Sequence, residues 1–200
     1  MTSPADLNRP GGGATLRRRA LDAARPLLEE AGVEGLHLRL IADKAGSAVA
    51  SLYYHFADKD ELLTELAIQG WRDLAAKIAK AMERGASSHR VEDASSAYLR
   101  FIQAHPQLYA LMQSRSVLTG DADARAAEQK AYGVFRSSLD GDDRVPAAQV
   151  ESVSLLLWVL GRGIAAAMLT EGDQNSDAAT RLRMKVLSGF AFLLSPGFRV

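Results

Sequence analysis

The chain has 200 residues, of which 48% are hydrophobic and 24% are charged, and its formal net charge is zero. This composition is typical of a globular protein with a buried core, and the neutral balance argues neither for nor against nucleic acid. Because the chain has no cysteine, disulfides, thiolate nucleophiles and cysteine-ligated metals are excluded.

Residues 1–14 are expected to form a disordered tail, because Pro10 and the glycines that follow it break regular structure. The tail has no apolar core of a secretory signal. The longest apolar stretch, over 153–169, is interrupted by Arg162 and is too short to span a bilayer. We therefore expect a cytoplasmic protein without a membrane partner.

The first helix is predicted to begin near Leu16. Its apolar residues recur at helical spacing: Leu16, Ala20, Ala23, Ala24, Leu27, Leu28 and Ala31. Pro26 removes a backbone donor and predicts a local kink, and Gly32 is a plausible C-cap.

Two short helices are predicted next, over 38–45 and 49–56. Gly46 lies between them, where a tight turn needs a residue that tolerates positive φ. Asp58 then begins a long helix that reaches about residue 84, and Glu61 stands three residues later as in a capping box.

Further helices are expected at about 91–104, 106–118, 121–140, 146–170 and 176–194. Prolines open two of them, and Pro196 closes the last. No alternating strand pattern occurs. The predicted fold is all-α, with a small N-terminal unit over 15–64 and a larger helical bundle over 65–200.

The helix over 49–56 has an inward and an outward face. At 100° per residue, Leu52 and Phe56 fall on one inward stripe. The outward side chains are those of Ala50, Ser51, Tyr53, Tyr54 and His55. An outward helix after a tight turn is typical of a helix-turn-helix, whose second helix enters the major groove of DNA.

The chemistry of these residues suits DNA. Tyrosine hydroxyls and a histidine can donate to phosphate oxygens, Lys59 adds a charge, and Arg39 can reach phosphate or a guanine edge. The arginines at 17–19 can approach the backbone of DNA. The alternative is that Tyr53, Tyr54 and His55 cap an apolar interface between two helical units.

The segment "LRLIADKAGSAVASLYYHFADKDELL" resembles the DNA-binding domain of the TetR family of bacterial regulators. The matching positions are Ile41, Ala42, Ala45, Gly46, Leu52, Tyr53, His55, Phe56, Lys59 and Leu62. The resemblance implies DNA contacts by Arg39, Ser51, Tyr53, Tyr54, His55 and Lys59. It spans about residues 16–66.

The segment departs from the family pattern at several caps. Ser47 stands where valine is usual, Ala48 where a capping serine is usual, Ala50 where glycine is frequent, and His37 where threonine or serine is frequent. A weaker N-cap costs about 1 kcal/mol unless Ser47 caps a shifted start. Ala48, Val49 and Ala50 offer only apolar contact to thymine methyl groups.

The segments "YLRFIQAHPQLYALM" and "WVLGRG" resemble a TetR subgroup that has a tryptophan and then His-Gly late in the chain. Arg162 replaces that histidine. The resemblance implies that residues 65–200 bind a small-molecule effector and form a homodimer. The helix around 153–160 is apolar nearly all round, which predicts burial on more than one face, one in the bundle and another against a partner subunit. A second candidate interface is Met184, Leu187, Phe190, Leu193 and Leu194.

An effector pocket is expected among aromatic, methionine and polar residues of this part. Its candidate residues are Tyr98, Phe101, His105, Tyr109, Met112, Trp158 and Arg162. An aromatic and methionine stripe at helical spacing is also what an ordinary core shows, so this alternative stays open.

Other classes of function find little support. No catalytic or phosphate-binding motif is present, and Gly161-Arg-Gly163 follows no strand. His89 and Glu92 could touch a metal, but two ligands are weak support. We therefore expect no catalytic residue, no metal and no cofactor. A helical adaptor that binds protein through residues 53–55 is the remaining alternative to a repressor that binds an operator in double-stranded DNA.

Overall fold

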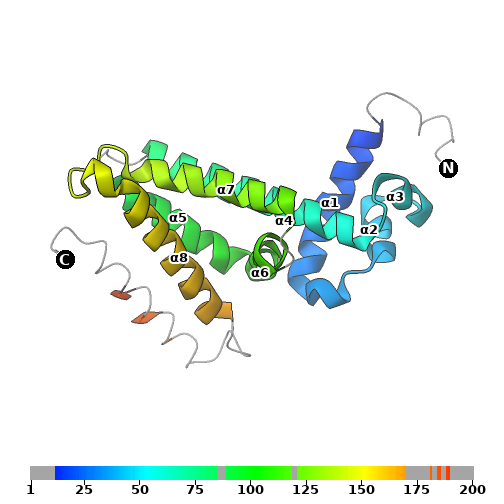
Figure 1. Ribbon diagram of the computed structural model, residues 1–200. Coiled ribbons are helices and arrows are strands. Elements are labelled where there is room, and N and C mark those ends of the chain that lie inside the picture. Colours follow the sequence, from blue (N-terminus) through cyan, green and yellow to red (C-terminus); the bar gives the residue numbers. More distant parts are fainter. Residues whose placement is uncertain are drawn as a thin grey trace. The chain divides into compact units, whose positions relative to one another are not determined.

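The computed structural model describes residues 12–84, 89–118 and 121–169, together with residues 181, 184, 185, 188 and 189. Every regular element in these ranges is helical (Figure 1), which confirms the predicted all-α fold. The helices are α1 Gly12–Gly35, α2 Leu38–Ala45, α3 Val49–His55, α4 Lys59–Arg84, α5 Arg90–Ala104, α6 Pro106–Gln113, the π-helix η3 Ser114–Leu118, α7 Ala122–Arg136, the 3-10 helices η4 Ser137–Leu139 and η5 Ala147–Gln149, and α8 Val150–Leu169.

Two predictions about the ends of the chain fall mainly outside these residues. The tail expected over 1–14 lies outside them up to residue 11, and α1 already includes residues 12–14. Of the interface residues expected on the last helix, only Met184 is described, and its side chain is exposed.

The chain divides into two compact units. Unit 1 comprises Met1–Gly70 and His105–Arg125, and unit 2 comprises Trp71–Ala104 and Ala126–Val200. Unit 1 therefore contains α6 as well as α1, α2, α3 and the first part of α4. We expected a boundary after residue 64, which would place α6 in the C-terminal bundle and not with α1, α2 and α3.

The core of unit 1 is built around α1, which packs against α2, α3 and α6. Its buried residues come from the predicted apolar stripe: Leu16, Ala20, Ala23, Ala24 and Leu28. The helical dihedrals continue through Pro26 and break at Gly32, where φ is 65°. The kink expected at Pro26 is therefore absent from these dihedrals, whereas the break falls at Gly32, the predicted C-cap, because glycine adopts positive φ freely.

Helix α6 is attached to unit 1 by a carboxylate and by close packing. Glu29 of α1 accepts hydrogen bonds from the backbone N–H groups of Gln107 and Leu108, each at 3.1 Å. These N–H groups belong to the first turn of α6, where no helical acceptor is available. On the α4 side, a Cβ atom added to Gly70 would lie 2.5 Å from the sulfur of Met112. Glycine at 70 therefore permits the close approach of α4 and α6.

The centre of unit 2 is a group of aromatic rings around Trp158 of α8, which we call the aromatic cluster. The ring centroids of Tyr98, Tyr132, Phe135 and Trp71 lie 5.2, 5.7, 5.6 and 6.1 Å from that of Trp158. These distances are typical of packed aromatic pairs. The rings come from α4, α5 and α7, so the cluster joins four helices of the unit.

Helix α8 has one buried and one exposed face. Ser154, Trp158 and Ala165 are buried, whereas Leu155, Leu156 and Val159 are 51%, 65% and 55% exposed. One face of α8 is thus buried within the chain, as expected, and the second face, which we expected to meet a partner subunit, stays a prediction. The expectation that the apolar stretch over 153–169 is too short for a bilayer is wrong by length, because the helical span Ala147–Ala167 is long and apolar enough to cross a membrane by length and composition alone, a test that core helices also pass.

Candidate nucleic-acid interface

Helices α2 and α3 form a tight helix-turn-helix through Gly46. This glycine has φ 65° and ψ 47°, a left-handed conformation that other residues adopt only with strain. The N–H of Gly46 donates to the carbonyl of Asp43, and that of Ser47 donates to the carbonyl of Ala42. These bonds satisfy carbonyls at the end of α2. The turn predicted from the position of Gly46 is confirmed.

The outward face of α3 carries the aromatic side chains. Leu52 and Phe56 are buried, whereas Tyr53 is 56% exposed and Tyr54 is 87% exposed. His55 is half-buried, and its ring meets the edge of Tyr54 at a centroid distance of 5.3 Å. The predicted orientation is confirmed. Tyr53 and Tyr54 are therefore not part of the core and are available to a partner outside the chain.

The first residues of α3 form a small, mainly apolar surface. Ala48 and Ala50 are exposed, and Val49 and Ser51 are half-buried. Ala48 is the N-cap and supplies no side-chain bond. The hydroxyl of Ser47 instead donates to the carbonyl of Ala48 at 3.2 Å, so Ser47 does not replace the missing cap.

Lys59 is only partly available to DNA. Its ammonium group donates to the carbonyl of Val33 at 2.7 Å and so ties the start of α4 to the end of α1. An ammonium group has three donors, and two remain for a phosphate. Arg39 on α2 is exposed and is better placed for an outside partner.

Of the three arginines expected near the DNA backbone, Arg17 turns toward the protein. Its guanidinium group binds the carboxylates of Glu61 and Glu65 at 3.1 and 3.0 Å. Arg18 and Arg19 are exposed, and Arg18 lies 3.8 Å from Asp22. The sequence marked a basic stretch but gave no sign that its first member is internal.

The start of α4 is held by a variant of the predicted capping box. The N–H of Glu61 donates to the Asp58 carboxylate at 2.8 Å, and the N–H of Ala57 donates to the Glu61 carboxylate at 2.7 Å. The bond from Ala57 and then the bond from Arg17 hold the pKa of Glu61 below its ordinary value. Asp60, also in this turn, has a lowered pKa because Arg115 of η3 binds it at 2.6 Å.

The residues expected around an effector fall into two groups. Tyr98, Phe101, Trp158 and Arg162 belong to unit 2, whereas His105, Tyr109 and Met112 belong to unit 1. In unit 2, Tyr98 packs on Trp158, and Arg162 binds the nearly buried Glu128 at 3.2 Å. In unit 1, the hydroxyl of Tyr109 accepts a hydrogen bond from Gln113 at 2.9 Å.

Sequence reasoning missed other members of this environment in unit 2. Tyr132 and Phe135 stand three residues apart on one face of α7, a spacing that could have marked them as partners of Trp158. No spacing in the sequence indicates in the same way that Glu128 is buried beside Arg162.

Unit 2 also contains a cavity of about 460 Å³. It is lined by Arg136, Leu139, Asp140, Gly141, Asp142, Asp143, Val145, Ala147 and Val150, and by none of the predicted effector residues. Glu92, weighed with His89 as a metal ligand, binds Arg144 at 2.5 Å.

Two family models match the chain. Residues 20–66 match the model described as bacterial regulatory proteins, tetR family, and residues 91–193 match the tetracyclin repressor-like C-terminal domain. The chain belongs to the TetR family. The resemblance predicted from residues 16–66 is thereby confirmed, whereas the subgroup suggested by Trp158 stays a prediction.

Individual relatives agree with this assignment. The transcriptional repressor KstR of Mycolicibacterium smegmatis is 29% identical over 180 residues, which cover 83% of this chain and 85% of the relative. The class D tetracycline repressor of Escherichia coli is 42% identical over 53 residues, or 26% of this chain and 24% of the relative.

Solved structures share the fold. A Rhodococcus protein of unknown function is 26% identical, with a TM-score of 0.66 over 87% of this chain and 94% of that one. The fatty acid degradation regulator FadR of Bacillus halodurans is 16% identical, with a TM-score of 0.67 over 96% and 98% of the two chains. This TetR-family chain is a ligand-responsive DNA-binding regulator of transcription.

Proposed function

We propose that the chain is a repressor that binds a near-palindromic DNA operator as a homodimer and is released by a small molecule. The observation that carries this proposal is the exposed aromatic face of α3 directly after the Gly46 turn. A recognition helix of seven residues reads too few base pairs alone. Two copies on symmetric half-sites extend the sequence that is read.

The aromatic face of α3 is assigned to the DNA backbone. The hydroxyls of Tyr53 and Tyr54, the imidazole of His55 and the hydroxyl of Ser51 can all donate to phosphate oxygens. Lys59 adds a charged donor through the two hydrogens that Val33 does not use. These contacts fix the register of the protein on DNA without reading its sequence.

Base readout is assigned to the start of α3 and to α2. Ala48, Val49 and Ala50 can contact thymine methyl groups, and none of them offers paired hydrogen bonds. Arg39 is the nearest exposed long donor and can reach the O6 and N7 atoms of guanine. The half-site should therefore have few strongly fixed positions, and at least one should be a thymine.

Dimerisation is assigned to the exposed apolar face of α8. Leu155, Leu156 and Val159 present large side chains on this face, and Gly163 and Ala166 continue it as exposed small residues. Small residues allow a second helix to approach closely. Burial of this face by a second copy would supply the second buried side that the sequence predicts for α8.

The effector is assigned to residues 65–200, as in the TetR subgroup with a tryptophan at the position of Trp158. Arg162 stands in place of the subgroup's histidine. Together with its partner Glu128, it supplies the polar groups that orient a ligand beside the aromatic cluster.

Residues 15–64 then form the DNA-binding part. We place the protein in the cytoplasm, without enzymatic activity and without a membrane role for α8.

The test is selection of duplexes from a random DNA library by the full chain, followed by sedimentation of the free protein and of the complex. The proposal predicts a near-palindromic consensus that is bound by a dimer. A protein that stays monomeric at micromolar concentration and binds with full affinity would refute the dimer. An adaptor that binds protein through Tyr53 and Tyr54 would enrich no consensus.

A further inference from the structure

Arg17 of α1 contacts both ends of the segment that joins α3 to α4. Its guanidinium group donates to the carbonyl of His55, binds Glu61 at 3.1 Å and binds Glu65 at 3.0 Å. The same group lies over the ring of Phe56, with Cζ 4.5 Å from the ring centroid. One side chain therefore joins three helices of unit 1.

The partners of Arg17 are the groups that end α3. His55 is the last residue of α3, and its carbonyl is one of the acceptors that a helix end leaves unsatisfied. Phe56 is the buried residue on which α3 ends. Glu61 also accepts the N–H of Ala57, so the guanidinium and this carboxylate together enclose the α3–α4 turn.

Helix α3 depends on such anchors because it is short. A seven-residue helix is unstable alone, and its N-cap, Ala48, makes no side-chain bond. At 1.5 Å per residue the helix is about 10 Å long. A rotation of about 10° around its last residue would then move its first residue by about 2 Å, which is enough to break a hydrogen bond or an apolar contact to a base.

We propose that Arg17 is a positioning residue for DNA recognition, which fixes the angle of α3 through His55, Phe56 and Glu61 instead of contacting a phosphate. This inference rests on the proposed function of α3 as the recognition helix. The opposing possibility is that the remaining donors of the guanidinium bind DNA. The two roles differ in what they do to specific and non-specific binding.

The main experiment compares Arg17→Gln with Arg19→Gln, which removes an exposed arginine of the same helix that is expected near the DNA backbone and should therefore weaken binding to all duplexes equally. Affinities of the full chain are measured for the selected operator and for a scrambled duplex, over a range of salt. A positioning role predicts that Arg17→Gln weakens operator binding by about 5- to 100-fold. Binding to the scrambled duplex and its salt slope should stay close to those of the unchanged protein.

A phosphate role predicts a different result. Arg17→Gln would then weaken both duplexes equally and lower the salt slope by about one contact, which would overturn the proposal. Unchanged operator affinity would also overturn it. If the unchanged protein bound no duplex at all, the proposed function would fail and this inference with it, whereas a normal protein with an unaffected variant refutes only the role of Arg17.

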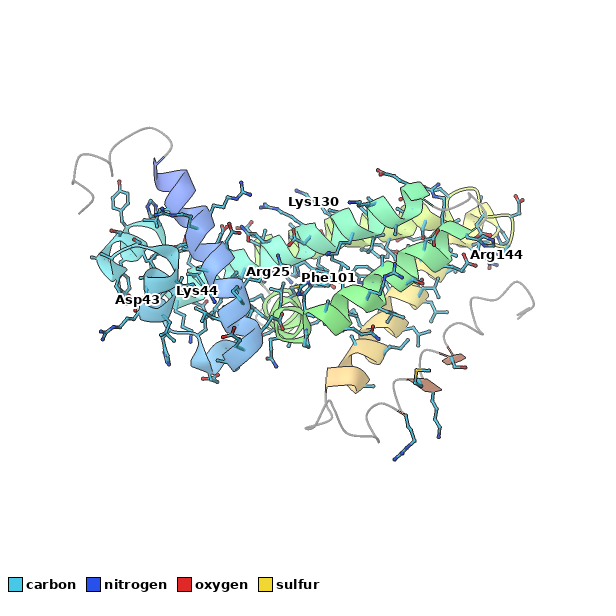
Figure 2. All side chains as sticks on the ribbon, turned by 180° about the vertical axis from the view of Figure 1, so that it is seen from behind. Arg25, Asp43, Lys44, Phe101, Lys130 and Arg144 are labelled. Atoms are coloured by element: carbon cyan, nitrogen blue, oxygen red, sulfur yellow. The ribbon has the colours of Figure 1, made fainter. Side chains whose placement is uncertain are left out.

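A second variant, Glu61→Gln, tests the contact between Arg17 and Glu61 by whether operator affinity rises or falls. Glu61→Gln removes a negative charge from the DNA-binding unit, and by charge alone it should strengthen binding to any duplex. The positioning role predicts weaker operator binding, because Arg17 loses a charged partner. The matched control is Asp43→Asn, which removes an exposed carboxylate from α2 (Figure 2) and should leave operator binding equal or stronger.

Folding is checked by circular dichroism and thermal melting, so that affinities are compared only for folded protein. Arg17→Lys keeps a charge and one donor but lacks the planar fork of the guanidinium. It should therefore restore part of the operator affinity lost in Arg17→Gln. If Arg17→Lys, folded and dimeric, bound the operator no better than Arg17→Gln, an anchor made by a charged donor at residue 17 would be contradicted.

Discussion

Replacing Glu29 with alanine should loosen α6 from the rest of unit 1. The half-buried carboxylate of Glu29 accepts the N–H groups of Gln107 and Leu108, each at 3.1 Å, and so caps the first turn of α6 from another helix. The N-cap residue, His105, supplies no side-chain cap hydrogen bond to this turn. The substitution leaves two backbone donors without their charged acceptor.

The size of the effect follows from these two bonds. Loss of an N-terminal cap costs about 0.5–2 kcal/mol, and loss of a negative charge at a helix N-terminus costs about 0.3–1 kcal/mol. Together they predict a loss of about 1–3 kcal/mol. For a chain of this size each kcal/mol lowers the melting temperature by about 2–4 °C, so Glu29→Ala should melt about 2–12 °C earlier.

Hydrogen exchange locates the effect. The amides of Gln107 and Leu108 should exchange about 5- to 150-fold faster, which is the same 1–3 kcal/mol expressed as a local opening. The control is Glu30→Ala, a change of the exposed neighbour on α1, which should alter neither quantity. Equal melting temperatures and equal exchange in the two variants would refute the carboxylate cap.

Three further changes have defined outcomes. Lys59→Ala should cost about 0.5–1.5 kcal/mol of stability through the lost bond to Val33. It should also weaken binding to all DNA sequences equally and lower the salt slope by about one contact. Unequal losses of affinity across sequences would show that Lys59 contacts a base. Replacing the conserved thymine of a selected half-site with uracil should cost about 1 kcal/mol of binding, and no loss at any thymine would assign readout to DNA shape. Because the pKa of Glu61 is depressed below its ordinary 4.5, its contribution to stability is present above that value and is lost as the pH falls through the depressed pKa; chemical denaturation should show a shallower acid loss in Glu61→Gln, and an identical acid profile would contradict the pairing.

Local features of unit 1 could be predicted from the sequence because local physics determines them. Gly46 marks the α2–α3 turn since only glycine adopts its left-handed conformation without strain. The helical period then places Leu52 inward and Tyr54 outward. The cap by Asp58 followed from a spacing of three residues.

Features that depend on distant partners could not be predicted. The carbonyl that binds Lys59 is 26 residues away, the carbonyl that binds Arg17 is 38 residues away, and the amides capped by Glu29 are 78 and 79 residues away. No periodic pattern encodes such pairs. For this reason we expected α6 in the bundle and Arg17 near the DNA backbone, whereas α6 packs on α1 and Arg17 binds Glu61 and Glu65.

The most direct test of the account is the affinity of the full chain and of Tyr54→Ala for the selected operator, measured by fluorescence anisotropy as the salt rises from about 50 to about 200 mM. Binding of α3 to DNA phosphates predicts that the logarithm of the affinity falls linearly with the logarithm of the salt concentration. Tyr54→Ala should bind more weakly at every salt concentration while melting like the unchanged protein, because this side chain is 87% exposed. Salt-independent binding, or a Tyr54→Ala protein with unchanged affinity, would contradict the assignment of α3 as the DNA-reading helix.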